Sequence, residues 1–170
     1  SSGIGGHHVD PAYDGMTKEP LSNSDCETLT GEFQEAIEWA SQWPTLGDAE
    51  DAGFHMLVGY TEGMGTHHAR LGDFNMSNEL FDFNDPEFIG TAIDADFDYS
   101  QPEFLMYSGE DQDSELVGFA WYVQAPTDSP PAGFTGDNDW WHRHDSLCFQ
   151  VDVMIVMGEN IEEETCSNRD

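Results

Sequence analysis

Net charge is the strongest constraint on how this chain can fold. The sequence has 35 Asp and Glu residues, and its four basic residues are Lys18, Arg70, Arg143 and Arg169, so the formal net charge at pH 7 is −31. Repulsion among the carboxylates opposes compaction of the chain unless counterions screen it, and at molar salt the Debye length falls to about 3 Å. We therefore expect a halophilic protein. An acidic protein from a low-salt or cation-rich setting is the alternative.

The same charge restricts the partners that the protein can bind. Phosphate groups of nucleic acids and anionic membranes would be repelled, whereas metal ions and cationic partners would be attracted. No stretch reaches the roughly 18 apolar residues that a membrane-spanning helix needs, so we expect no membrane insertion. The sequence begins at Ser1 without Met. This start is typical of a secreted protein after removal of its signal peptide, and a shortened chain would look the same.

Length and composition favour a single folded domain. The chain has 170 residues, of which 38% are hydrophobic, including eleven Phe and five Trp. This is enough apolar material for one core without help from metal or disulfides. Residues 1–22 are rich in Gly, Pro and Ser without a usable period, so we expect an extended N-terminal arm there and a single α+β domain over residues 23–170.

The clearest helix signal follows the arm. Ser24 and Glu27 have the spacing of a capping box, and a helix should follow and end before Pro44. Apolar residues then recur at steps of three and four and predict one buried stripe, made of Cys26, Leu29, Phe33, Ala36, Ile37 and Ala40. Thr45 and Asp48 form a second capping signal, which predicts a short helix ending at Gly53.

Four segments are predicted to be strands: 54–60, 103–107, 116–124 and 147–157. Gly63-Met64-Gly65 predicts a sharp turn after the first, and residues 109–114 a polar turn before the third. The third is apolar on both faces, which favours a position in the middle of the sheet or between layers. Residues 73–101 should form a long loop, and Glu162 to Glu164 a last helical turn. We expect an α+β fold, with an N-terminal helix packed on a mainly antiparallel sheet that could be sandwich-like or barrel-like.

Histidines at two places in the sequence indicate a metal site. If Trp140 to His144 is extended, His142 and His144 point to the same side. His67 and His68 follow the glycine turn, and because neighbours on a strand face oppositely, one of them could turn towards the first pair. Imidazole suits Zn and Cu, and Asp139 is the nearest carboxylate that could act as a further ligand or orient a His. The alternative is that these histidines form hydrogen bonds within an aromatic core.

Other possible ligands in the sequence are weaker signals. His7 and His8 in the arm are more often solvated than bound to metal. Asp94-x-Asp96-x-Asp98 and Asp111-x-Asp113-x-Glu115 have spacings that could bind Ca²⁺ weakly, although such spacings arise by chance in so acidic a chain. The sequence contains no complete catalytic constellation, so it does not establish an enzyme.

Several segments together resemble an uncharacterised family of secreted or surface bacterial and archaeal proteins. They are Gly63 to His68, Gln101 to Tyr107, Leu116 to Gly118, Gly133 to Asp139, Trp141 to His144, Leu147-Cys148 and Glu162 to Cys166. The resemblance implies that the two His segments belong together and that Cys148 and Cys166 form a pair. Such a disulfide would place the protein in an oxidising compartment.

The function expected from these observations is metal binding outside the cell. We expect a secreted or cell-surface halophilic protein with a Zn-type or Cu-type site ligated by His67, His68, His142 and His144. A structural subunit of a filament or surface layer, assembling through the N-terminal arm, is the first alternative. A metal-dependent enzyme is the second.

Overall fold

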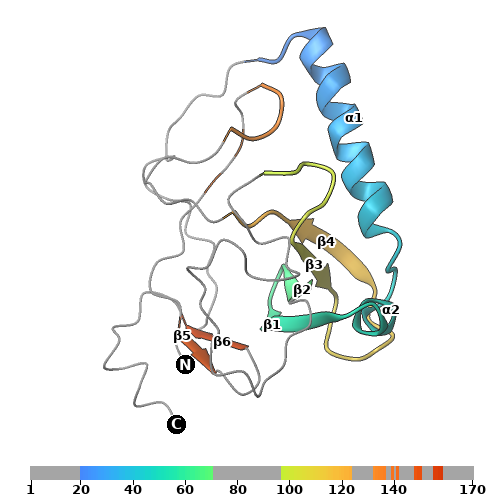
Figure 1. Ribbon diagram of the computed structural model, residues 1–170, viewed down its shortest axis with the longest axis vertical. Helices are drawn as coiled ribbons and strands as arrows, with labels where there is room; N and C mark the ends of the chain where they lie inside the picture. The colour runs from blue at the N-terminus through green and yellow to red at the C-terminus, as the bar shows by residue number, and fades with distance from the viewer. Residues whose placement is uncertain are drawn as a thin grey trace.

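In the residues that it describes, the computed structural model has one long helix, one short helix and two antiparallel sheets. It describes residues 20–70, 97–123, 132–136, 139 and 141, together with the backbone of 148–150 and 155–158. The elements in chain order are α1 (Asn23–Ala40), α2 (Leu46–Asp51), β1 (Phe54–Thr61), β2 (Gly65–Arg70), β3 (Phe104–Tyr107), β4 (Leu116–Ala120), β5 (Cys148–Gln150) and β6 (Ile155–Gly158). Figure 1 shows both helices on the right of the four-stranded sheet and the β5–β6 pair on its left. The α+β prediction is confirmed, and the described strands do not close into a barrel.

Helix α1 begins two residues earlier than the sequence pattern predicted. Its N-cap is Ser22, whose hydroxyl accepts a hydrogen bond from the Asp25 amide at 3.1 Å, while the Asp25 carboxylate accepts from the Ser22 amide at 3.2 Å. This is the same reciprocal arrangement that we assigned to Ser24 and Glu27. The prediction was wrong because Ser22 and Asp25 have the same spacing and lie earlier in the chain.

The buried face of α1 also differs from the predicted stripe. Ala36 and Ala40 are fully buried as expected, but Cys26 is exposed, and Phe33 and Ile37 are 38% and 45% exposed. Two small residues on the inner face let the helix approach its neighbours closely. The larger apolar side chains, including Cys26, which was predicted to face the core, therefore lie at the edge of the contact or outside it.

Helix α2 follows its sequence signals closely. The Thr45 hydroxyl accepts from the Asp48 amide and the Asp48 carboxylate accepts from the Thr45 amide, so the predicted capping box is present. Gly53 follows the helix with a φ of 87°, a conformation that favours glycine. The short helix therefore ends where the sequence predicted.

The larger sheet has the strand order β1-β2-β3-β4, with every neighbouring pair antiparallel. The third predicted strand, now β4, is therefore an edge strand among the described strands and not a central one. Tyr107 pairs with Leu116 and Met106 with Gly118, so Val117 is an extra residue in β4 and is 57% exposed. Trp121, which follows β4, packs edge-on against both Phe119 and Phe33 of α1, so these apolar side chains contact the helix.

The last predicted strand, residues 147–157, is two strands in the structure. β5 and β6 pair with each other, with Phe149 opposite Val156 and Gln150 opposite Ile155. The alternation of apolar residues along this segment does not reveal where the chain reverses, so the prediction of one continuous strand was wrong. Strand β6 also lies against β1, and this contact connects the two sheets.

The hydrophobic core lies between the helices and one face of the larger sheet. It is built from Ala40, Leu46, Ala49, Phe54, Leu105 and Tyr107. The Tyr107 hydroxyl donates to the Trp43 carbonyl at 2.9 Å and so connects β3 to the chain between the helices. At the edge of this core the Arg70 guanidinium lies 4.9 Å from the ring centres of both Trp43 and Phe54.

Three predictions fall wholly or largely outside the described residues. These are the N-terminal arm, of which only residues 20–22 are described, the long loop at 73–101, of which 97–101 are described, and the helical turn near Glu162. In the described part of the chain, no helix is long and apolar enough to cross a membrane.

Candidate functional site

The glycine turn before β2 sets the position of its two histidines. Gly63 and Gly65 both have a φ of 84°, and the Met64 amide donates to the Thr61 carbonyl at 3.0 Å, so the predicted sharp turn is confirmed. A Cβ on Gly65 would collide with the carbonyl oxygen of Tyr107. The start of β2 therefore lies close to β3. His67 and His68 follow in β2, which lies between β1 and β3.

His68 faces the helical core. Its ring packs edge-on against the Tyr107 ring at 5.4 Å, and its Nε2 lies 2.9 Å from the Thr66 hydroxyl oxygen. The Thr66 hydroxyl donates its hydrogen towards the Gly109 carbonyl at 3.1 Å, so we assign the proton of this contact to His68 Nε2. This leaves a lone pair on Nδ1, and that atom is buried without a hydrogen-bond partner among the described residues.

Burial, as the main cause, and positive charge on His67 and His55 together lower the pKa of His68 from 6.5 to about 4. His68 is only 1% exposed. The side chain is therefore neutral at neutral pH but enclosed in the core. His68 therefore has the properties expected of a histidine within the core. A metal ion from solvent would not reach its ring.

His67 lies on the opposite face of the sheet. Its ring contacts Phe104 edge-on at 6.0 Å, and Phe104 in turn contacts Tyr122 edge-on at 5.8 Å. Phe104 precedes the core residue Leu105, so its side chain points away from the helices, as does that of His67. His67 is 9% exposed and also takes part in further interactions. Of the two adjacent histidines, His67 is therefore the one outside the helical core.

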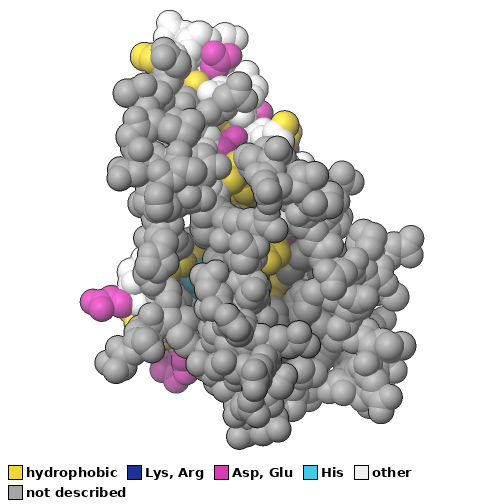
Figure 2. All heavy atoms as spheres, turned by 90° about the vertical axis from the view of Figure 1, so that its left-hand side faces the viewer, with side chains coloured by type: hydrophobic (Ala, Val, Ile, Leu, Met, Phe, Trp, Pro, Cys, Tyr) yellow, Lys and Arg dark blue, Asp and Glu magenta, His cyan; other side chains and the backbone are white. Residues whose placement is uncertain are grey.

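His55 belongs to the same face and was missed in the sequence analysis. It lies opposite Ala69 in the β1–β2 register, so its side chain points to the same side of the sheet as Ala69 and His67. The sequence signal that could have identified it is the strand period, since the antiparallel hairpin around the glycine turn brings residue 55 close to residue 69. Figure 2 shows histidine atoms beside hydrophobic side chains on the face that is seen from the left of Figure 1.

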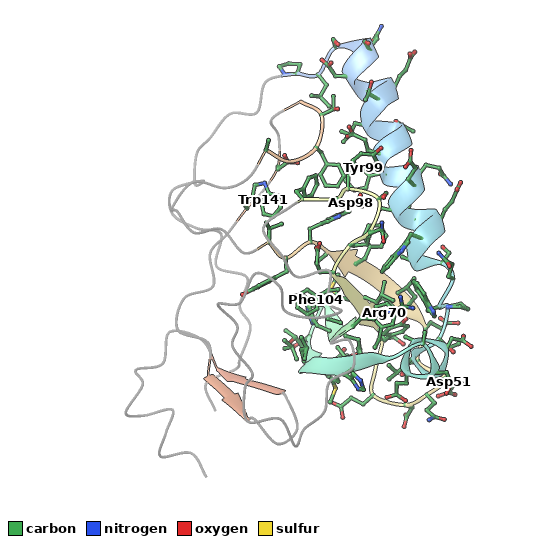
Figure 3. The ribbon with its side chains drawn as sticks, viewed as in Figure 1. Asp51, Arg70, Asp98, Tyr99, Phe104 and Trp141 are labelled. Atoms are coloured by element: carbon green, nitrogen blue, oxygen red, sulfur yellow. The ribbon has the colours of Figure 1, made fainter. Side chains whose placement is uncertain are left out.

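Asp139 and Trp141 lie in a different part of the structure, near the middle of α1. Trp141 packs edge-on against Phe97 at 5.6 Å, and a Cβ on Gly133 would collide with the Asp139 carboxylate. Figure 3 shows Trp141 at the level of Asp98 and Tyr99, whereas Phe104 lies lower, in the sheet. The described contacts of Asp139 are thus with this loop region.

The loop that contains Gly133 is attached to α1 by a partly buried pair of hydrogen bonds. The Thr135 amide and hydroxyl donate to the two carboxylate oxygens of Glu32, at 3.0 and 2.7 Å. Phe134 stacks on Phe33 of α1, with ring centres 4.7 Å apart, and also contacts Phe97 and Trp121. The chain that leads to His142 therefore starts from a fixed position.

Several predicted site residues lie outside the described residues. His142, His144 and Cys166 are among them, and of Cys148 only the backbone is described. Within the described ranges, no group of three or more His, Cys, Asp or Glu side chains is arranged to hold a metal ion. The structure therefore places one part of the predicted site, His67, and leaves the convergence of the two His segments a prediction.

One carboxylate of the acidic spacings that suggested Ca²⁺ binding has a structural role. Asp98 caps its own loop, since its carboxylate accepts from the Ser100 amide at 2.9 Å and from the Gln101 side chain at 3.1 Å. The Asp111 carbonyl accepts from the Ser114 amide at 2.8 Å and closes the predicted polar turn.

Comparison with known proteins found no match: no family model, no curated protein and no solved structure is similar to this chain.

Proposed function

We propose that this protein binds a transition metal ion, Zn or Cu, through histidine. The ligands would be His67 from the sheet together with His142 and His144, and Asp139 would be a further ligand or would orient one of the imidazoles. The observation that carries the proposal is the position of His67, which lies on the sheet face away from the helical core. His68, the other half of the pair, is enclosed in that core.

The path of the chain supports a meeting of the two segments. Trp141, immediately before His142, is packed against Phe97, and Cys148, four residues after His144, begins β5. The partner strand of β5, β6, lies against β1, which pairs with β2. The segment 142–147 therefore connects two described positions, the second of which belongs to the small sheet beside the β1–β2 hairpin.

The chemistry of imidazole suits such a site. A metal ion needs the neutral form of the ring, so binding competes with protons and weakens as pH falls. Three imidazoles with one position open to water or a carboxylate would hold Zn²⁺ at nitrogen distances of about 2.0–2.1 Å. An acidic surface raises the local concentration of cations and favours capture of the ion.

Metal analysis of protein purified without added metal, followed by Zn²⁺ and Cu²⁺ titration after chelator treatment, tests the proposal. We expect near-stoichiometric binding that the double variant H142A/H144A loses. The double variant H7Q/H8Q removes as many histidines from the arm and should bind normally. Equal binding by H142A/H144A and the unchanged protein would contradict the proposed ligand set. Weak Ca²⁺ uptake by acidic loops should persist in all variants.

We also propose that the protein works outside the cell in high salt, with Cys148 and Cys166 joined. A crosslink of this kind stabilises by about 3 kcal/mol, mainly through the unfolded state. Mass spectrometry of the unreduced protein should detect the peptide pair. The exposed Cys26 should react with iodoacetamide without unfolding, and a disulfide involving Cys26 would contradict the pairing.

Self-assembly into a filament or surface layer is the second candidate, and the position of β4 at the edge of the described sheet favours it. Edge strands carry unpaired backbone groups that can pair with another chain, and Val117 on this strand is 57% exposed. Deleting residues 1–21 should abolish assembly while the domain stays folded. A monomer at all salt concentrations, measured by light scattering, would exclude this function.

A further inference from the structure

A cross-strand pair of histidines lies on the sheet face that points away from the helices. His55 in β1 is opposite Ala69 in β2, and His67 is two residues from Ala69 on the same strand. Side chains two residues apart on a strand share a face, so His55 and His67 are diagonal neighbours across the β1–β2 pair.

Diagonal neighbours in antiparallel sheets lie close enough for long side chains to meet. Their separation is about 7–8 Å, which aromatic-sized side chains can span. The two residues directly opposite them are small or medium-sized: Ala69 opposite His55, and Val58 opposite His67. A bulge at Leu57, which lies between the paired residues Met56 and Val58, increases the local twist next to the pair.

The neighbouring His68 does not belong to this pair, because it lies opposite the core residue Leu105 in the β2–β3 register. His68 faces the other side of the sheet, with its Nε2 engaged by Thr66.

We infer that His55 and His67 form the sheet half of a transition-metal site and bind Zn²⁺ or Cu²⁺ together. This inference rests on the proposed function but changes its ligand set, because it adds His55. His55 is exposed and would form the solvent side of the site. His67 is buried against Phe104 and would be the more rigid ligand.

Removing His55 would affect metal affinity differently if it is a ligand than if it is a solvated surface histidine. A solvated His55 would contribute nothing to tight binding of an ion. As one of two ligands from the sheet, it would supply a metal–nitrogen bond. Loss of a ligand should weaken binding by about tenfold or more, because the loss of an outer-shell partner alone has an effect of that size.

Isothermal titration with ZnCl₂ and with CuCl₂ of the full chain, after chelator treatment, tests the pair. We expect H55Q and H67Q each to weaken metal binding by about tenfold or more. The H7Q/H8Q variant should bind the ion as the unchanged protein does. Because His55 is exposed, H55Q should keep the melting temperature of the unchanged apo-protein. His67 is buried, so the melting temperature of H67Q must be measured to separate lost binding from lost stability. Electron paramagnetic resonance of the Cu²⁺ complex should show one fewer coordinated nitrogen in H55Q.

The possible results separate this inference from the proposed function. If H142A/H144A loses the ion but H55Q binds as the unchanged protein does, the inference is overturned and the proposed function stands. If H55Q loses affinity but H142A/H144A does not, the sheet pair stands and the proposed partner segment is wrong. Absence of stoichiometric Zn²⁺ or Cu²⁺ binding by the unchanged protein would overturn both.

Discussion

At the scale of single residues, the buried His68 makes stability depend on pH. Its pKa is about 4 in the folded protein and 6.5 in an ordinary environment, so below pH 6.5 the unfolded chain binds a proton that the folded chain does not. Stability contributed by neutral His68 is complete above pH 6.5 and is lost progressively as pH falls to about 4. The loss is on the order of 2–3 kcal/mol.

Replacing His68 by Gln should therefore flatten the pH dependence of stability. Chemical unfolding of the apo-protein between pH 7 and pH 4.5 should show a smaller decrease for H68Q than for the unchanged protein, even if H68Q is less stable at pH 7. The H7Q/H8Q variant controls for loss of imidazoles elsewhere. Parallel curves for H68Q and the unchanged protein would show that His68 does not resist protonation.

Gly65 and Gly63 form a matched pair of residues for testing the turn. Both have a φ of 84°, but a Cβ would meet nothing within 4 Å at Gly63 and would collide with the Tyr107 carbonyl at Gly65. G63A should lose about 1–2 kcal/mol from the left-handed conformation alone. G65A should lose several kcal/mol, since overpacking adds about 1–3 kcal/mol to that strain. Urea unfolding measures both, and equal losses would contradict the close approach of β2 to β3.

At the scale of elements, one side chain of α1 holds the loop at residues 132–136. Glu32 accepts two hydrogen bonds from Thr135, and this pair is partly buried. Hydrogen bonds to charged groups contribute about 1.5–3 kcal/mol each at most, so their removal should allow the loop to open locally.

E32A should therefore speed hydrogen exchange of the Thr135 amide while leaving the amides of β2 and β3 protected. E27A removes an exposed carboxylate of the same helix and is the matched control. If the E32A and E27A variants exchange at the same rate at Thr135, Glu32 does not hold the loop. E32A should also weaken metal binding if residues 132–141 position His142 and His144.

At the scale of the whole molecule, charge repulsion should set the salt dependence of stability. A net charge of −31 on 170 residues destabilises the compact state more than the expanded one, and added salt screens this repulsion. The melting temperature should increase continuously from low to molar KCl, as measured by circular dichroism. A melting temperature that does not change over this range would exclude the halophilic interpretation.

Local signals in the sequence were sufficient for much of the fold. The short helix after Thr45, the glycine turn at residues 63–65 and the strands around Phe54 and Leu105 were predicted from capping residues, positive-φ glycines and apolar runs. Each depends on residues within one or two turns of the chain, so the physical cause is present in the sequence itself. The same applies to the net charge, which is a sum over residues and needs no structure.

Only the tertiary structure decided which faces are buried. Cys26, Phe33 and Ile37 fit an apolar stripe by spacing, but the close approach of α1 at Ala36 and Ala40 leaves them largely exposed. In the predicted strand 116–124, Trp121 packs against Phe33 of α1, and β4 lies at the edge of the described sheet.

The histidines show the same division. From the sequence, His67 and His68 are equivalent candidates and His55 is not one. The structure encloses His68 with Thr66 and Tyr107 and places His55 diagonal to His67 across two strands. This depends on the strand register, which is fixed by contacts between distant residues such as Gly65 and Tyr107. Periodicity therefore determined that the two adjacent histidines face oppositely, and packing determined which of them lies outside the core.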